Sequence, residues 1–198
     1  MELLYTKTSP FARKVRIFAI EKELPLKLIE ENPYEKRPSL LEKNPAGKIP
    51  VLLRENGKPL IDSSVICEYI DLLNDTPILI PRNGEDRFEV LHRAAVADAM
   101  LEAGLALYVE KNNHGEGINQ KFQRNKELAV ETSLQFFEDR IDDLKTFQYD
   151  NVSLICALGS LAFRIPELVD YSKFPKLEKW AREMSRRKSV LETVPEIG

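Results

Sequence analysis

The stretch TSPFARKVR, residues 8–16, decides how the first part of this chain folds. A serine stands directly before a proline, and the residues that follow have the apolar spacing of a helix. Proline suits the first helical position and serine suits the cap before it, so a helix is expected over residues 10–23. The apolar face of this helix carries Phe11, Val15, Phe18 and Ala19.

Apolar runs on both sides of this helix, at 3–6 and 24–31, predict two strands. Strands joined by a helical crossover are parallel, and the crossover is right-handed. The next expected elements are a helix, two strands and a helix, at 39–43, 51–54, 59–62 and 63–73. Asn56-Gly57 lies between the two strands and is a strong hairpin signal, because both residues tolerate positive φ. The predicted order is therefore β-α-β-α-β-β-α, an α+β domain over residues 1–76.

The rest of the chain has a different pattern. A polar stretch with prolines predicts a linker at 77–84. Beyond it the sequence predicts helices at 85–111, 120–144, 152–165 and 176–187, and it contains no convincing strand. The stretch 152–165 is nearly all apolar, as expected of a central buried helix. We therefore expect an all-α helical-bundle domain over residues 85–198.

Composition excludes several classes of function. The 29 basic and 32 acidic residues are spread along the chain, and the net charge of -3 favours neither nucleic acid nor a membrane surface as partner. Cys67 and Cys156 form no CxxC pair, and His92 and His114 have no partners at ligand spacing, so no metal site is expected. The first residues have no charged region followed by an apolar one, so no signal peptide is expected, and no run approaches about 20 apolar residues. The sequence therefore predicts a soluble, cytoplasmic protein.

Ser9 has two interpretations. It is a plain helix cap, or it marks an anion site, because a helix N-terminus carries unpaired N–H groups and partial positive charge. A thiolate is such an anion, and its pKa falls at a helix N-terminus. Glutaredoxin-like folds hold a Cys-Pro-x-Cys pair at this point, and here the same frame reads Ser9-Pro10-Phe11-Ala12. A thiol site without its own thiol indicates a borrowed thiol, and glutathione supplies one.

Two further elements fit a peptide ligand. Pro50 opens the strand at 51–54, and a cis Ile49-Pro50 bond would turn the Ile49 backbone outward to pair with another peptide; an ordinary trans turn is the alternative. Asp62 and Ser63 stand at a strand-to-helix junction, where both are good caps. They also suit a γ-glutamyl group, since a carboxylate takes its ammonium and a hydroxyl at a helix N-terminus takes its carboxylate.

Taken together, these motifs resemble the glutathione transferase family, specifically the short bacterial type with a serine at the active-site helix. The resemblance covers essentially the whole chain. It is carried by SPFxRKVR at 9–16, NPxGKIPVL at 44–52 and DSxxIxxY at 62–69, and by CALG, FR and FPxLxxW at 156–159, 163–164 and 174–180.

The resemblance implies a thioredoxin-like first domain, a helical second domain with the second-substrate pocket, glutathione as co-substrate, no metal, and a cytoplasmic homodimer that acts in detoxification. By the same resemblance Ser9 is the catalytic residue and hydrogen-bonds the glutathione sulfur. The other implied glutathione contacts are Phe11, Lys48, Ile49, cis Pro50, Asp62 and Ser63, and Asp98 reaches the glutathione of a partner subunit.

Two positions depart from the family's pattern. The usual Glu-Ser of the γ-glutamyl site is Asp62-Ser63, and the capping box before the buried helix is replaced by QYDN at 148–151. We expect an enzyme that transfers glutathione to an electrophile or reduces a disulfide with it. The alternative is a non-catalytic interaction or regulatory module of the same architecture. The electrophile itself has no legible signal in the sequence.

Overall fold

The computed structural model describes residues 1–196, with the backbone alone for Glu116, and divides into two units. The first unit contains residues 1–80 together with the segment from 188 onward, and the second contains residues 81–187. Sequence analysis expects the whole of 85–198 in the helical domain, whereas the structure groups the end of the chain with the first unit. The physical reason is that Arg13 and Arg16 bind backbone carbonyls of this last segment.

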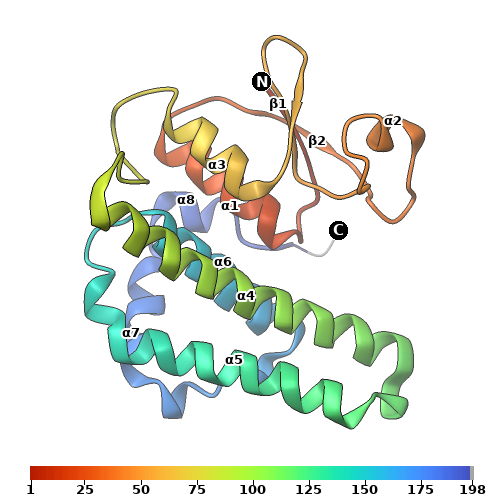
Figure 1. The fold of residues 1–198 in the computed structure, drawn as a ribbon, viewed down its shortest axis with the longest axis vertical. Coiled ribbons are helices and arrows are strands. Elements are labelled where there is room, and N and C mark those ends of the chain that lie inside the picture. Colours follow the sequence, from red (N-terminus) through yellow and green to blue (C-terminus); the bar gives the residue numbers. More distant parts are fainter. Residues whose placement is uncertain (197–198) are drawn as a thin grey trace. The chain divides into compact units, whose positions relative to one another are not determined.

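The first unit is built on a four-stranded sheet (Figure 1). Its strands are β1 (Glu2–Tyr5), β2 (Lys27–Glu30), β3 (Val51–Leu53) and β4 (Pro59–Leu60), in the spatial order β2-β1-β3-β4. The parallel pairing of β1 with β2 is confirmed. Strand β3 runs antiparallel to both β1 and β4, as the hairpin prediction requires.

The helices of this unit are α1 (Pro10–Glu21), α2 (Pro38–Leu41), α3 (Ser63–Asp71) and the short α8 (Lys188–Leu191). The predicted order β-α-β-α-β-β-α is therefore confirmed, and it is the order of a thioredoxin-like domain. Helices α1 and α3 lie side by side (Figure 1). Helix α2 supplies Leu40 to a buried cluster with Leu4 and Val51.

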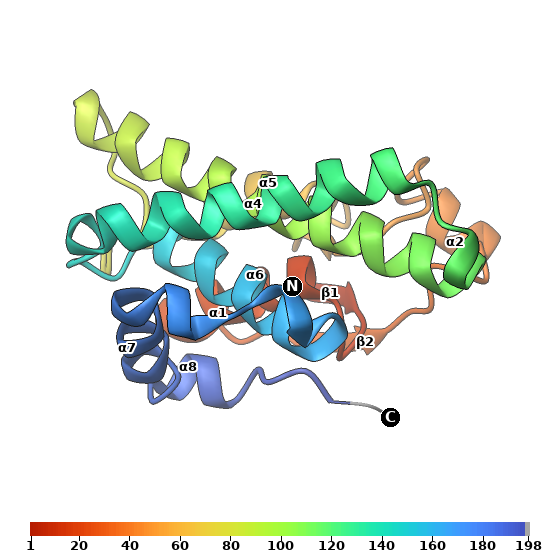
Figure 2. The ribbon, with the colours of Figure 1, turned by 90° about the horizontal axis from the view of Figure 1, so that it is seen from below.

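The second unit consists of helices and the loops that connect them, with no strand among its described residues. Its long helices are α4 (Gly84–His114), α5 (Gln120–Arg140), α6 (Tyr149–Arg164) and α7 (Pro175–Met184). Short 3-10 turns lie at Gly115–Gly117, Ile141–Asp143, Pro166–Leu168 and Tyr171–Lys173. Figure 2 shows α4 and α5 running alongside each other. Within residues 1–196 no helix is long and apolar enough to cross a membrane.

Helix α6 is the core of the second unit, as the sequence predicts. Twelve of its residues are buried, and it packs closely against α4. The close approach depends on Gly104, because a Cβ at this position would lie 2.3 Å from a methyl carbon of Leu161. The helix begins at Tyr149, three residues before the predicted start. Its cap position is Gln148, and Asp150 accepts a hydrogen bond from the backbone of Asn151 at 2.9 Å.

Candidate functional site

Ser9 is the N-cap of α1. Its backbone is extended, its Oγ accepts a hydrogen bond from the Ala12 backbone N–H at 3.2 Å, and its carbonyl accepts from Arg13 N at 2.9 Å. The capping interpretation is therefore confirmed. It does not conflict with an anion site, because Oγ uses a lone pair in this bond and its own proton remains available to a ligand.

The sheet register brings the predicted site segments to one end of the sheet. Leu4 of β1 pairs with Val51 of β3, so the carboxyl end of β1 and the start of β3 lie together. Strand β4 runs antiparallel to β3, so its carboxyl end lies at the same end. Ser9 follows β1, Pro50 precedes β3 and Asp62 follows β4. Three segments far apart in sequence thus meet at one end of the sheet.

The loop before β3 is stabilised by hydrogen bonds of one of its own buried side chains. The Asn44 side chain is buried; its amide donates to the Lys48 carbonyl at 2.8 Å, and its Oδ1 accepts from Ala46 N at 3.0 Å. The Ile49–Pro50 bond is cis, as the resemblance implies. Lys48 is exposed, Ile49 is half-buried and Pro50 is buried. Sequence analysis includes Asn44 in the motif at 44–52 without giving it a role, although an Asn before a proline in a loop is a known turn signal.

Asp62 and Ser63 begin α3. Asp62 is the N-cap, and its Oδ1 accepts from the backbone N–H and the hydroxyl of Ser64, both at 2.7 Å. The Asp62 side chain is exposed, whereas Ser63 is buried with 2 % of its surface accessible. The capping interpretation is confirmed here too, and Ser64 is a partner that sequence reasoning missed. An exposed carboxylate with two bonds on one oxygen keeps the other oxygen for an ammonium group.

The remaining predicted residues take no part in the hydrogen bonds described above. Phe11 is half-buried on α1, and the Lys14 ammonium lies 5.3 Å from the centre of its ring. Asp98 is half-buried on α4 and belongs to the second unit. Its contact with a partner subunit stays a prediction. Among residues 1–196, no group of three His, Cys, Asp or Glu side chains is placed to hold a metal ion.

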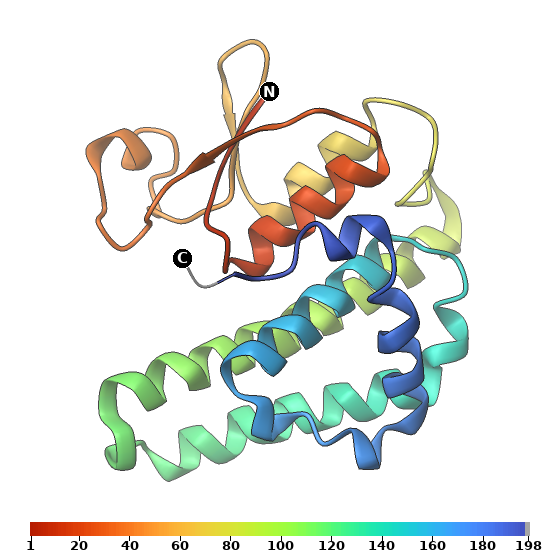
Figure 3. The same ribbon diagram turned by 180° about the vertical axis from the view of Figure 1, so that it is seen from behind.

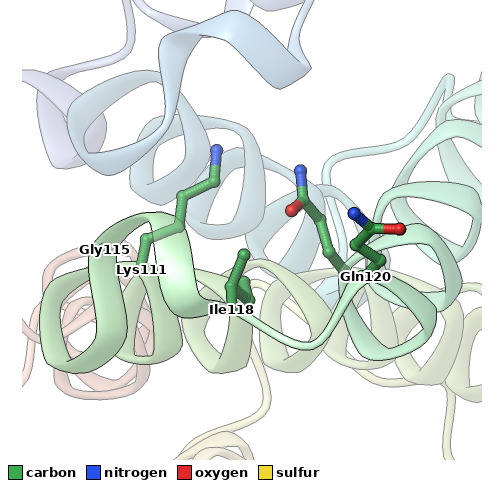
Figure 4. Close-up of a pocket in the computed structure, with 5 residues that line it drawn as sticks. Lys111, Gly115, Ile118 and Gln120 are labelled. Atoms are coloured by element: carbon green, nitrogen blue, oxygen red, sulfur yellow. The ribbon is translucent and has the colours of Figure 1, made fainter.

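A cavity of about 490 Å³ opens at the turn between α4 and α5 (Figure 4). Its lining residues all belong to the second unit: Lys111, Gly115, Ile118, Gln120 and Gln123. The ammonium of Lys111 is paired with Glu167 at 2.8 Å, and the Gln123 amide donates to Glu127 at 2.7 Å. Two of the lining side chains are thus already engaged in polar contacts, and the lining includes none of the residues predicted for glutathione.

Comparison with known proteins agrees with this fold. Residues 8–73 match the family model described as glutathione S-transferase, N-terminal domain. An uncharacterized GST-like protein, YibF of Escherichia coli (strain K12), is 31 % identical over 98 % of both chains. A crystal structure of a glutathione transferase family member from Pseudomonas fluorescens Pf-5 with bound glutathione is 32 % identical over 99 % of both chains, with a TM-score of 0.92.

A second structure of a family member from Pseudomonas fluorescens Pf-5 contains bound S-(propanoic acid)-glutathione. It is also 32 % identical, covers 98 % of this chain and 99 % of that one, and has a TM-score of 0.89. A βαβαββα domain with a serine at the start of its first helix, joined to a helical unit, defines a glutathione transferase-like protein. The chain belongs to the glutathione transferase family.

Proposed function

We propose that this protein binds glutathione in its first unit and activates the glutathione thiol for transfer to a small electrophile. The observation that carries the proposal is the meeting of three segments at one end of the sheet: the α1 N-terminus at Ser9, the Ile49–Pro50 turn, and the α3 N-terminus at Asp62. The relatives from Pseudomonas fluorescens Pf-5, which hold glutathione or a glutathione thioether, support the same ligand for this chain.

Each proposed contact matches one part of the tripeptide. The backbone of Ile49 pairs with the cysteinyl residue, the Asp62 carboxylate takes the γ-glutamyl ammonium, and Ser63 with the α3 N-terminus takes the γ-glutamyl carboxylate. Lys48 is exposed and approaches the glycyl carboxylate, and Phe11 lies beside Ser9 on α1.

The chemical step begins with the thiol of bound glutathione. Ser9 donates its hydroxyl proton in a hydrogen bond to the sulfur, which favours the thiolate over the thiol and releases the thiol proton to solvent. The thiolate then attacks an electrophilic carbon, a C–S bond forms, and the electron pair moves to the leaving group or to the neighbouring atom. Disulfide reduction is the related outcome. The thiolate attacks one sulfur of the substrate disulfide, the S–S bond breaks, and the other sulfur leaves as a thiolate that takes a proton from solvent. A second glutathione then attacks the mixed disulfide, which releases the remaining substrate thiol and gives glutathione disulfide. The reaction uses glutathione as co-substrate and needs no metal.

The proposal extends to a homodimer in the cytoplasm that acts in detoxification. The homodimer and the role in detoxification rest on the family resemblance, whereas the cytoplasmic location is supported by the state of the cysteines. Cys67 and Cys156 are both buried thiols, and reduced cysteines are the rule in reducing compartments.

Calorimetric titration with glutathione tests the binding site. The wild type should bind saturably, and Ser63→Ala should bind more weakly, because it removes a hydroxyl from the γ-glutamyl end. Ser9→Ala should keep most of the affinity and lose about a hundredfold in turnover with an activated aryl halide, the order seen when one donor to a reacting anion is removed.

Two results would count against the proposal. No heat of binding with folded wild type would reject the glutathione site and redirect the search to protein partners. Equal losses of affinity and turnover in Ser9→Ala would remove Ser9 from the chemical step.

A further inference from the structure

The last described segment, residues 188–196, folds back onto the helix that carries Ser9. Helix α8 packs against α1, and the tail after α8 continues beside it (Figure 3). Arg16 donates to the Glu192 carbonyl at 3.1 Å, and the Ser189 hydroxyl hydrogen-bonds to the Glu21 carboxylate. Because all these residues belong to the first unit, the segment is part of the domain that we propose binds glutathione.

Arg13 makes the most buried of these contacts. Its exposed fraction is 6 %, and that of Thr193 is 0 %. Arg13 Nε donates to Thr193 Oγ1 at 3.3 Å, and Arg13 Nη2 donates to the Val190 carbonyl at 3.2 Å. The Thr193 hydroxyl in turn donates to the Ser189 carbonyl at 2.7 Å. The hydroxyl proton is thus already used, and Thr193 is oriented to accept from the guanidinium.

Both of these acceptors are neutral. Buried arginines are usually paired with carboxylates, since burial of an uncompensated charge is costly. Across residues 1–196 the side-chain partners of Arg13 are a hydroxyl and a carbonyl. The segment 188–196 therefore replaces some of the hydrogen bonds with water that the guanidinium loses on burial, and it does not neutralise the positive charge.

This charge lies one helical turn from Ser9. Arg13 N donates to the Ser9 carbonyl at 2.9 Å, and one turn rises about 5.4 Å along the axis. Helical side chains lean toward the helix N-terminus, which is the end that Ser9 caps. A buried cation at this range acts through a lower effective dielectric than an exposed one, so water and salt screen it less.

We infer that Arg13, held by the neutral acceptors of the C-terminal segment, lowers the pKa of the glutathione thiol bound at Ser9. The inference rests on the proposed function. Arg13 acts on the sulfur through its field and is not assigned a contact with it. The C-terminal segment thereby becomes a working part of the site, because it keeps Arg13 both buried and charged.

Other charges surround the same helix. They are Lys7, Lys14, Arg16, Glu21 and the C-cap Lys22 on α1 and its flanking residues, Glu30 at the end of β2, Glu68 and Asp71 on α3, and Lys188, Glu192 and Glu196 on the last segment. The pairs Lys7–Glu196 and Lys188–Glu192 are exposed and 3.9 Å apart, so solvent screens them. Lys14 is a second buried cation, stacked on Phe11. A test must therefore change the charge at Arg13 and leave Lys14 alone.

The pair Thr193→Asp and Thr193→Asn makes this test. Both side chains have nearly the same size, and each presents an oxygen to Arg13, but the aspartate neutralises the guanidinium. The readout is the pKa of bound glutathione, followed by the ultraviolet absorbance of the thiolate across a pH series. Thr193→Asp should raise the pKa of bound glutathione by about 1. At pH values below this pKa, turnover of Thr193→Asp should fall about tenfold, whereas the pKa and turnover of Thr193→Asn should stay near those of the wild type.

Arg13→Met and Arg13→Lys give a second pair. The first should raise the pKa of bound glutathione as Thr193→Asp does, and the second, which keeps a cation, should restore it. Equal pKa values in Thr193→Asp and Thr193→Asn, with glutathione bound normally, would overturn the role of Arg13 and leave the glutathione site standing. If folded wild type binds no glutathione, the proposed function fails and the inference falls with it.

Discussion

The two units each bury an ion pair, and the two pairs are solvated very differently. In the first unit the Lys22 ammonium lies 3.3 Å from a carboxylate oxygen of Asp71. It also donates to three backbone carbonyls, those of Asp71, Asn74 and Pro77, at 2.7–3.0 Å. The Asp71 carboxylate accepts from the backbone N–H groups of Leu79 and Ile80. Both charges are thus met by several fixed dipoles.

In the second unit the pair is Arg93 with Asp150. Arg93 Nε donates to Asp150 Oδ2 at 2.8 Å, and the other carboxylate oxygen accepts from Asn151 N at 2.9 Å. Burial nevertheless raises the pKa of Asp150, against the lowering by the Arg93 hydrogen bond and charge. The hydrogen bonds and the charge that this carboxylate receives therefore do not repay its desolvation. We expect the larger number of fixed dipoles around Lys22 and Asp71 to make the first pair the more stabilising of the two.

Lys22→Met should have the largest effect in this comparison. The substitution keeps an unbranched apolar stem and leaves Asp71 buried without its ammonium, together with carbonyls that have lost a donor. We expect the free energy of unfolding to fall by about 4 kcal/mol, within the range for breaking a buried pair. Urea unfolding measures it. Lys27→Met is the matched control, because its pair with Glu2 is exposed and should contribute little.

A loss in Lys22→Met no larger than that in Lys27→Met would mean that the dipoles around Lys22 are not what stabilises the pair. The same variant reports on residues 74–80, whose carbonyls and N–H groups Lys22 and Asp71 bind. Amide exchange in this segment should accelerate in Lys22→Met more than exchange in β1, because these two side chains bind carbonyls and N–H groups of the segment.

The same contacts show what sequence can and cannot predict. The order of elements and the motifs at Ser9, Pro50 and Asp62 follow from local rules: periodicity, capping and turn chemistry act over a few residues. Lys22 and Asp71 stand 49 residues apart, and each alone looks like a polar residue on a helix surface. No local pattern distinguishes such a pair from exposed charges.

The domain assignment predicted for the end of the chain differs from the structure for the same physical reason. Residues 188–196 carry no strong periodicity, and their assignment to the first unit depends on Arg13 reaching Thr193 and Val190. The start of α7 is similar: the Glu138 carboxylate of α5 accepts from the N–H groups of Lys176 and Leu177, whereas the cap residue is Phe174, whose ring offers no acceptor. The placement of these two segments therefore depends on polar contacts between residues far apart in sequence, which local sequence patterns do not predict.

Arg93→Met should have the next largest effect. It leaves Asp150 buried beside α4, but this carboxyl already has a raised pKa and can bind a proton in place of its partner. Protonation limits the loss, so we expect the free energy of unfolding at neutral pH to fall by about 2–3 kcal/mol, less than in Lys22→Met. Arg182→Met, which breaks an exposed pair with Glu178 on α7, is the control. A loss greater than that of Lys22→Met would reverse the comparison.

Asp150→Asn should give the smallest effect, and its signature is a pH dependence. Because the folded pKa of Asp150 lies above its ordinary value of 3.8, the folded state binds this proton more tightly than the unfolded state does. Wild-type stability relative to Asp150→Asn should therefore fall as pH rises from about 4 through the raised pKa, and then level off. Urea unfolding of both proteins across this range measures the difference.

Asp170→Asn provides a control of opposite sign. The pKa of Asp170 is lowered by hydrogen bonds from the Ser172 hydroxyl and backbone, so wild-type stability relative to this variant should increase as pH rises through the lowered pKa toward 3.8. If the Asp150 difference also increases with pH, the attraction of Arg93 outweighs desolvation after all. The second unit would then solvate its buried carboxylate as well as the first, with one guanidinium in place of several backbone dipoles.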